Sequence, residues 1–216
     1  MNKRSLVVIV GPGKDLGYEL ARKFGMDGYD IVFMGRDSAT IKLKMLPLAG
    51  EGIKINFIPI DLTNEKSITD AFIEVDKLNQ PVCGLIYNAV VRRIKTPSEI
   101  TAEEVADDLK VNFLGAVSCT AQILRRYKRA GNEFMMYTGG GVALTPSVPF
   151  ASMSVGKAAL HNYVLNLAEE FKDKAIYIGT VLITQKIQYG TKYAPDLIAG
   201  TYLKMIRTKE AVETVI

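Results

Sequence analysis

The feature that most constrains the fold is a regular alternation of short apolar runs with longer amphipathic segments along the chain. The runs are apolar on both faces, as is typical of buried parallel strands. We therefore predict an α/β fold of the Rossmann type, a doubly wound and mainly parallel sheet of about seven strands between two helical layers. The predicted strands are 5–10, 30–35, 53–60, 82–88, 133–138 and 176–183, and the tail at 211–216 can supply a seventh.

Helical patterns separate these runs, and such strand–helix–strand alternation implies right-handed crossovers. Thr101 followed by Glu104 predicts a capping box at the start of one of them. No internal repeat, linker or low-complexity tract interrupts the series, so a single domain over residues 1–216 is expected. The predicted helices are 14–28, 64–79, 101–131, 150–174 and 195–208.

Composition excludes several classes of protein. The 27 Lys and Arg residues exceed the 23 Asp and Glu residues by only four, and this excess is spread along the chain, so no nucleic-acid partner is predicted. Cys83 and Cys119 lie far apart, which argues against a disulfide framework and against a metal site. No stretch approaches the roughly 20 apolar residues of a membrane span. We expect a cytoplasmic protein with no membrane partner.

A glycine-rich turn follows the first predicted strand. Gly11, Gly13 and Gly17 stand between that strand and a helix, where a tight turn lets a pyrophosphate approach the backbone and the helix N–H groups. Asp15 is discordant, because a carboxylate at this place repels a phosphate. Either the neighbouring Lys14 neutralises it, or Asp15 acts as the N-cap of the helix.

The end of the second strand bears on the choice of cofactor. A carboxylate there holds the ribose 2′-OH of NAD, whereas an arginine accommodates the 2′-phosphate of NADP. Arg36 comes first and Asp37 follows it, so, together with Lys14, the sequence favours NADP(H) over NAD(H). The alternative is that Arg36 is a solvated loop residue.

Several motifs in order give the chain a resemblance to the short-chain dehydrogenase/reductase family. They are the glycine-rich turn, "DLT" at Asp61–Thr63, "YNAV" at Tyr87–Val90, "VNFLG" around Asn112, and the helix "SMSVGKAAL" with Lys157. The resemblance implies that Asp61, with Leu62 beside it, contacts the adenine of the cofactor. It also implies that Asn88 and Ala89 line the cofactor site, that Asn112 takes part in a proton relay through water, and that Lys157 binds the nicotinamide ribose.

The reaction centre departs from the pattern of that family. Its catalytic tyrosine, four residues before the lysine, is replaced by Met153, and a thioether has no proton to give. The position of its serine falls on Gly140, and only Thr138 keeps a hydroxyl on that turn. Val90 replaces a glycine of the Asn-Ala-Gly motif, and Asp15 replaces a loop glycine. Thr138 or an ordered water is the remaining source of a proton.

Two functions stay open from the sequence. The first is an NAD(P)(H)-binding oxidoreductase with an atypical active site, acting on an unidentified carbonyl or alcohol substrate. The second is a catalytically inactive relative that binds a nucleotide or only a partner protein and acts as a nucleotide sensor or protein-interaction module. Weak or absent cofactor binding is the alternative to the expected NADP(H) binding. The resemblance also implies a homo-oligomer, a dimer or tetramer through the helix at 150–172. The basic run 91–95 either faces an acidic substrate or is a solvated loop.

Overall fold

The computed structural model describes residues 4–13, 15–36, 38–128 and 130–216, so Lys14 and Asp37 lie outside it. Within these ranges seven strands form one sheet in the order β3-β2-β1-β4-β5-β6-β7, and every neighbouring pair is parallel. This confirms the predicted Rossmann-type α/β fold. The strands are β1 (Leu6–Val10), β2 (Asp30–Gly35), β3 (Ile55–Pro59), β4 (Val82–Tyr87), β5 (Glu133–Gly140), β6 (Ile176–Ile183) and β7 (Glu213–Val215).

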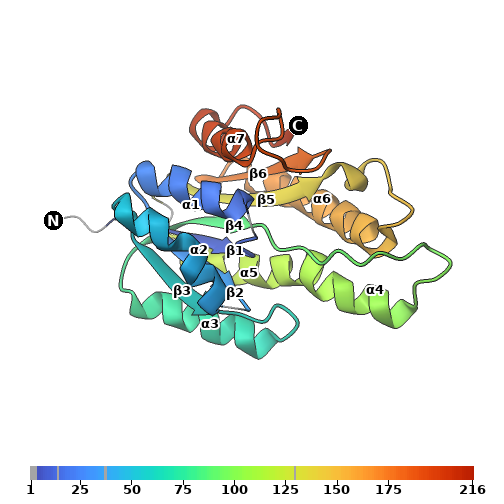
Figure 1. The fold of residues 1–216 in the computed structure, drawn as a ribbon. Helices are drawn as coiled ribbons and strands as arrows, with labels where there is room; N and C mark the ends of the chain where they lie inside the picture. The colour runs from blue at the N-terminus through green and yellow to red at the C-terminus, as the bar shows by residue number, and fades with distance from the viewer. Residues whose placement is uncertain (1–3, 14, 37, 129) are drawn as a thin grey trace.

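Helices cover both faces of the sheet (Figure 1). Helices α1, α2 and α7 pack on one face, and α3, α5 and α6 pack on the other. No helix in the described ranges is long and apolar enough to span a bilayer. The helices are α1 (Leu16–Met26), α2 (Ser38–Gly50), α3 (Glu65–Lys77), α4 (Ala102–Leu109), α5 (Gly115–Leu124), α6 (Ala151–Phe171) and α7 (Pro195–Thr208), with a π-helical turn at Lys110–Leu114 and a 3₁₀ turn at Gly141–Ala143.

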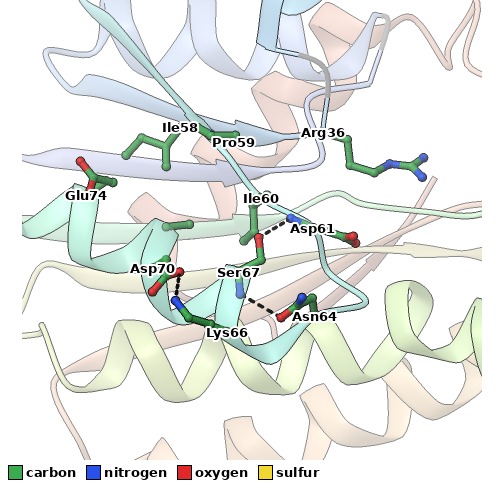
Figure 2. A pocket seen from close by; sticks show the side chains of 11 residues that line it. Arg36, Ile58, Pro59, Ile60, Asp61, Asn64, Lys66, Ser67, Asp70 and Glu74 are labelled. Atoms are coloured by element: carbon green, nitrogen blue, oxygen red, sulfur yellow. Dashed lines mark hydrogen bonds and ion pairs between the residues drawn. The ribbon is translucent and has the colours of Figure 1, made fainter.

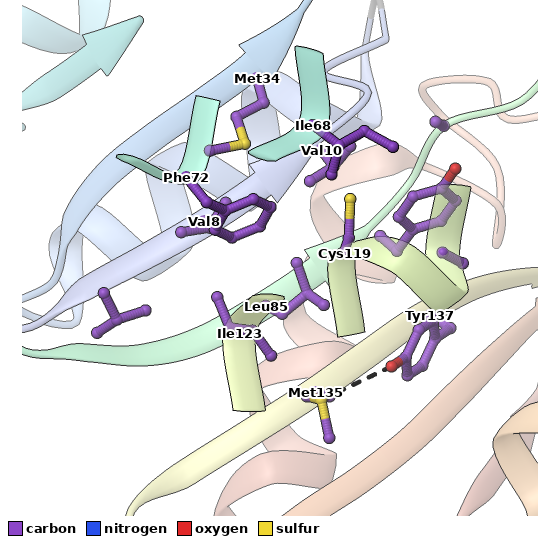
Figure 3. Packing of buried hydrophobic residues seen from close by; sticks show 14 of the residues in the cluster. Val8, Val10, Met34, Ile68, Phe72, Leu85, Cys119, Ile123, Met135 and Tyr137 are labelled. Carbon is purple, nitrogen blue, oxygen red and sulfur yellow. Dashed lines mark hydrogen bonds between the residues drawn. The ribbon is translucent and has the colours of Figure 1, made fainter. Parts of the chain in front are cut away.

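The continuous apolar runs are explained by two cores, one on each side of the sheet. Successive side chains of a strand point to opposite faces, so Val8 joins one core while Val7 and Ile9 join the other. Figure 3 shows the first core, in which Cys119 and other side chains of α5 lie over the central strands next to residues of α3. Its labelled members are Val8, Val10, Met34, Ile68, Phe72, Leu85, Cys119, Ile123, Met135 and Tyr137.

Two helical features differ from the prediction. Helix α2 was not predicted, because its apolar residues are not confined to one side. Leu43 and Leu46 are 70% and 61% exposed, whereas Met45 is buried, and Pro47 lies inside the helix. The single helix predicted at 101–131 is broken by the π-helical turn and ends at Leu124. The capping box at Thr101 and Glu104 is confirmed, with both of its hydrogen bonds formed.

The strand order reverses between β1 and β4, and ligands of open parallel sheets bind beside the carboxyl ends of the strands at such a point. Backbone bonds hold the segments that leave this edge. The Gly11 N–H donates to the carbonyl of Met34 at 2.9 Å, and the Asn88 N–H donates to the carbonyl of Val10 at 2.8 Å. The fold therefore brings the predicted turn and the Asn-Ala segment to the same edge.

Candidate active site

The glycine-rich turn is a tight turn that the backbone itself requires. Gly11 and Gly13 have φ values of 76° and 61°, in the left-handed region that favours glycine. A Cβ on Gly11 would lie 2.4 Å from the Cα of Ala89, and a Cβ on Gly17 would lie 1.4 Å from the carbonyl oxygen of Pro12. No side chain fits at either position without movement of the chain.

Asp15 stands at the N-cap position of α1, but its side chain makes no capping hydrogen bond, and it is exposed. The N-cap interpretation of Asp15 is not supported, because its side chain makes no capping hydrogen bond. The neutralisation of Asp15 by Lys14 stays a prediction, because Lys14 lies outside the described residues. The first-turn N–H groups of α1 thus have no side-chain cap, and groups of this kind bind phosphate oxygens well. The turn fits a pyrophosphate apart from the charge of Asp15.

A cavity of about 600 Å³ lies beside β3 and α3, where the chain leaves the carboxyl ends of β2 and β3. Figure 2 shows Arg36 and Asp61 at one end of the group of lining residues, and Asp70 and Glu74 of α3 at the other end. The carboxylate of Asp61 accepts from the Thr63 backbone N–H at 2.9 Å and from the Thr63 hydroxyl at 2.8 Å. These two bonds, and to a smaller extent the charge of Arg36, lower the pKa of Asp61 below its ordinary value.

Asp61 is therefore held as an oriented anion close to Arg36. The exposed Arg36 guanidinium makes no hydrogen bond or ion pair with the described residues. Leu62 is half-buried and packs against the core on the α3 face. Lys157 is not among the residues that line this cavity.

A chain of hydrogen bonds runs from α7 to the glycine-rich turn. The Thr138 hydroxyl donates to Oδ1 of Asn88 at 2.9 Å, and Nδ2 of Asn88 donates to the carbonyl of Gly11 at 2.7 Å. The Thr138 hydroxyl also lies 2.7 Å from the hydroxyl of Tyr202. Because threonine has one hydroxyl proton, Tyr202 is the donor in that contact.

This chain determines where the Thr138 hydroxyl points. It lies toward Tyr202 of α7. Lys157 approaches from α6, in the other helical layer, and its amine donates to the carbonyl of Thr138. The catalytic role predicted for Thr138 is not favoured by these contacts. Nothing in the sequence pointed to Tyr202, because its partner lies 64 positions away.

Lys157 is 5% exposed, and its Nζ donates to the carbonyl of Thr138 at 2.6 Å. Burial, and to a smaller extent the nearby positive charge of Arg92, together lower the pKa of Lys157 from 10.5 to about 8. A lysine with such a pKa can exchange a proton near neutral pH, which an ordinary surface lysine cannot.

Met153 is half-buried on α6, and the neighbouring hydroxyl groups are engaged elsewhere. Ser152 donates to Oδ2 of Asp108 at 2.7 Å, and Ser154 donates to the carbonyl of Phe150 at 3.0 Å. The hydroxyl of Tyr137 lies in the core, 2.6 Å from that of Thr120, and burial raises its pKa far above 10. None of these groups takes the place of the missing tyrosine.

Asn112 lies in the π-helical turn and is fully buried. Its Oδ1 accepts from the Val91 backbone N–H at 2.7 Å, and its Nδ2 donates to the Val91 carbonyl at 3.1 Å. Gly156 allows α6 to pack here, because a Cβ on it would lie 2.6 Å from the Cβ of Asn112. These contacts make the side chain of Asn112 a positioning group for the loop after β4, and its water relay stays a prediction.

The basic run at 91–95 divides into paired and unpaired groups. Arg93 makes two bonds to the buried carboxylate of Asp108, at 3.0 and 3.1 Å, and Lys95 pairs with Glu104 at 2.7 Å. Arg92 is exposed and makes no ion pair with the described residues. The pairing of Asp108 with the basic run was not predicted from the sequence. Its position four residues after Glu104 places both carboxylates on the same helix face, and this spacing is the signal that could have found it.

Comparison with known proteins agrees with the fold. The family model for short chain dehydrogenase matches residues 5–185. The chain is 24% identical to the 3-oxoacyl-[acyl-carrier-protein] reductase of Aquifex aeolicus over 175 residues, 81% of this chain and 71% of that protein. It is 27% identical to the very-long-chain 3-oxoacyl-CoA reductase of Schizosaccharomyces pombe over 180 residues, 78% of this chain and 52% of that protein, so it spans about half the length of this relative.

Solved structures share the architecture. An alcohol dehydrogenase from Thermococcus sibiricus, complexed with 5-hydroxy-NADP, superposes with a TM-score of 0.86 at 20% identity and covers 99% of this chain and 96% of its own. A short chain oxidoreductase from Pseudomonas aeruginosa, described as containing an atypical catalytic center, gives a TM-score of 0.77 at 18% identity over 83% of this chain and 69% of its own. Since the family model matches most of the chain and the fold agrees, the chain belongs to the short-chain dehydrogenase/reductase family.

Proposed function

We propose that the chain is an atypical NADP(H)-dependent oxidoreductase that acts on a carbonyl or alcohol substrate, with Lys157 supplying the proton that the family tyrosine would give. The observation that carries this proposal is the buried Lys157, whose pKa is lowered to about 8 beside a helix position that holds Met153. The names of the Aquifex and yeast relatives support a carbonyl substrate, and the choice of substrate stays open.

The cofactor would lie along the carboxyl edge of the sheet, and when bound it would supply or accept the hydride. The glycine turn at Gly11–Gly17 and the N–H groups of α1 would hold its pyrophosphate. Asp61, Leu62, Asn88 and Ala89 would line the adenosine half. The guanidinium of Arg36 makes no ion pair with the described residues, and this supports NADP(H) over NAD(H), because an arginine at this place can bind a 2′-phosphate.

The proton would come from Nζ of Lys157. Reduction of a carbonyl adds one hydride to carbon and one proton to oxygen. The Lys157 ammonium would give that proton to the developing alkoxide and would regain one from water. At pH 7 a group with a pKa of about 8 is about 90% protonated, so most molecules would carry the proton on Lys157. This ammonium would also release its proton more readily than that of a lysine with a pKa of 10.5.

The second candidate is the inactive relative, a nucleotide sensor or protein-interaction module. It is favoured by the engagement of the nearby hydroxyl groups, since those of Ser152, Ser154 and Thr138 all have hydrogen-bond partners other than Lys157. In this alternative the same edge would bind nucleotide, or only a partner protein, and Lys157 would play no chemical part.

The deciding experiment combines NADPH titration with a panel of carbonyl substrates. The active proposal expects NADPH binding and measurable turnover in the wild type, with the rate of reduction falling as the pH rises through about 8. Lys157→Met should lower kcat at least 100-fold, as expected for loss of a general acid, which is typically worth 10²–10⁴-fold. Lys172→Met, at an exposed lysine just beyond α6, is the matched control and should leave kcat unchanged.

A second pair of variants separates the two candidates. Serine fits at Gly140, because a Cβ there meets no atom closer than 3.6 Å and its φ of −158° is ordinary extended backbone. Met153→Tyr combined with Gly140→Ser should raise the rate of an enzyme that already turns over. If the wild type binds NADPH but is inactive, and only the double variant turns over, the inactive relative is the correct function. If NADPH does not bind at millimolar concentration, both nucleotide-dependent functions are wrong.

We also propose a homo-oligomer, a dimer or tetramer, that assembles through α6. Val155 and Leu165 are 52% and 39% exposed on this helix, which leaves apolar side chains at its surface. Sedimentation analysis of the wild type and of Leu165→Arg tests it, and a monomeric wild type would refute it. The cytoplasmic location stays a prediction.

A further inference from the structure

The exposed Arg92 lies on a loop whose backbone is fixed on both sides of it. On one side, the Val91 N–H and carbonyl are both bonded to the side chain of Asn112, at 2.7 and 3.1 Å. On the other side, the guanidinium of Arg93 makes two bonds to the buried carboxylate of Asp108, at 3.0 and 3.1 Å. The backbone position of Arg92 is therefore set by its neighbours, and its exposed side chain is accessible to a ligand.

This loop is also tied to α6, the helix that carries Lys157. The backbone N–H and carbonyl of Lys95 both bond to the chain where it enters α6, at 3.0 and 3.3 Å. The carboxylate of Asp108 adds a further link, because it accepts from the hydroxyl of Ser152 in the first turn of α6 at 2.7 Å. The loop that carries Arg92 is therefore fixed next to the proposed reaction centre.

The positive charge of Arg92 acts on Lys157. The pKa of Lys157 is lowered by burial first and then by the charge of Arg92, so the two cations lie close enough to interact. Arg93 and Lys95 of the same run are each paired with a carboxylate, whereas Arg92 makes no ion pair with the residues that the structure describes. Two cations held near each other repel, and an anion bound at Arg92 would relieve that repulsion.

The chemistry of a single guanidinium selects a carboxylate. Its one positive charge matches one carboxylate, and its parallel N–H donors match the two carboxylate oxygens. Resting on the proposed carbonyl reduction at Lys157, we propose that Arg92 is a specificity-determining residue that binds a carboxylate of the substrate. The substrate is then an oxo acid, whose carbonyl is reduced while its carboxylate is held at Arg92.

The test compares oxo acids with their uncharged primary amides in calorimetric titrations of the full chain. The acids are 2-oxopentanoate, 4-oxopentanoate and 5-oxohexanoate, which differ in the spacing between the carbonyl and the carboxylate. The titrations are made at saturating NADPH, or without nucleotide if NADPH does not bind. At least one acid should bind about 10-fold more tightly than its amide, as expected for hydrogen bonds between charged groups. Equal or weaker binding of every acid would overturn the proposal.

Two arginine variants locate the carboxylate. Arg92→Gln removes the charge at an exposed position, and it should weaken binding of the favoured acid about 10-fold without changing the affinity for its amide or for NADPH. Arg125→Gln, at an exposed arginine at the C-terminal end of α5, is the matched control and should leave every affinity unchanged. Wild-type affinity for the acid in Arg92→Gln, or an equal loss in Arg125→Gln, would overturn the proposal. So would a parallel loss of NADPH affinity in Arg92→Gln, because it would assign Arg92 to the phosphates of the cofactor.

Failure of the proposed function gives a different result. If the chain reduces neither the acid nor the amide but still binds the acid through Arg92, the reaction assigned to Lys157 is wrong and the recognition of a carboxylate stands. If both compounds are reduced and Arg92→Gln does not change the binding of the acid, the reaction stands and the role of Arg92 is wrong.

Discussion

The hydrogen-bond chain from Tyr202 through Thr138 to Asn88 gives the sharpest prediction about stability. Thr138→Val removes one hydroxyl with little change of shape, so the effect of a cavity is small. The change leaves two groups without their partner: the fully buried hydroxyl of Tyr202, and Oδ1 of the half-buried Asn88. An unsatisfied buried polar group costs about 1–3 kcal/mol, so we expect a loss of about 2–4 kcal/mol in the free energy of unfolding.

The partner variant separates the two contributions. Tyr202→Phe removes the donor but leaves Thr138 bonded to Asn88, and it should cost only about 1 kcal/mol. In the Tyr202→Phe background no orphaned phenol remains, so Thr138→Val should then cost about 1–2 kcal/mol less than in the wild type.

Urea unfolding of the wild type, both single variants and the double variant completes this cycle. Thr138→Ser, which keeps the hydroxyl, is the control and should retain the coupling to Tyr202. A coupling energy near zero, or a loss in Thr138→Ser as large as that in Thr138→Val, would refute the assignment of the hydrogen bonds. Either result would also mean that the Thr138 hydroxyl is available as a proton donor.

Two further predictions concern α6 and pH. Because the pKa of folded Lys157 is about 8 and its ordinary value is 10.5, the unfolded state binds more protons between these values, so stability should rise with pH across that window, by up to about 3 kcal/mol. Lys157→Met should abolish this rise in urea titrations at pH 7 to 10.5, and an unchanged pH dependence would show that the amine is not desolvated. Gly156→Ala, whose Cβ would lie 2.6 Å from that of Asn112, should lose about 1–3 kcal/mol through overpacking. Gly200→Ala, in α7 with nothing within 4 Å of the new Cβ, should gain up to about 1 kcal/mol, and similar thermal shifts in both variants would contradict the packing at Asn112.

Features set by neighbours in sequence were predicted well. The buried strands are apolar on both faces, and the capping box at Thr101 needs only Glu104, three residues away. The turn at Gly11 and Gly13 is required by local backbone geometry, which glycine alone meets without strain. Helix α2 was not predicted, because leucines on its exposed side obscure the amphipathic pattern. The break near Asn112 was not predicted either, because a π-helical turn has no strong local sequence signal.

What the sequence by itself determined is therefore the fold, the family pattern and the absence of a tyrosine at Met153. Only the tertiary structure decided what the remaining side chains are free to do. It directs the Thr138 hydroxyl to Tyr202, pairs Arg93 with Asp108, and leaves Oε2 of Glu19 without a donor among the described residues. It also buries Lys157 so that its pKa falls toward neutrality. The physical reason is that hydrogen-bond partners and desolvation depend on residues far apart in the chain, which no local pattern specifies.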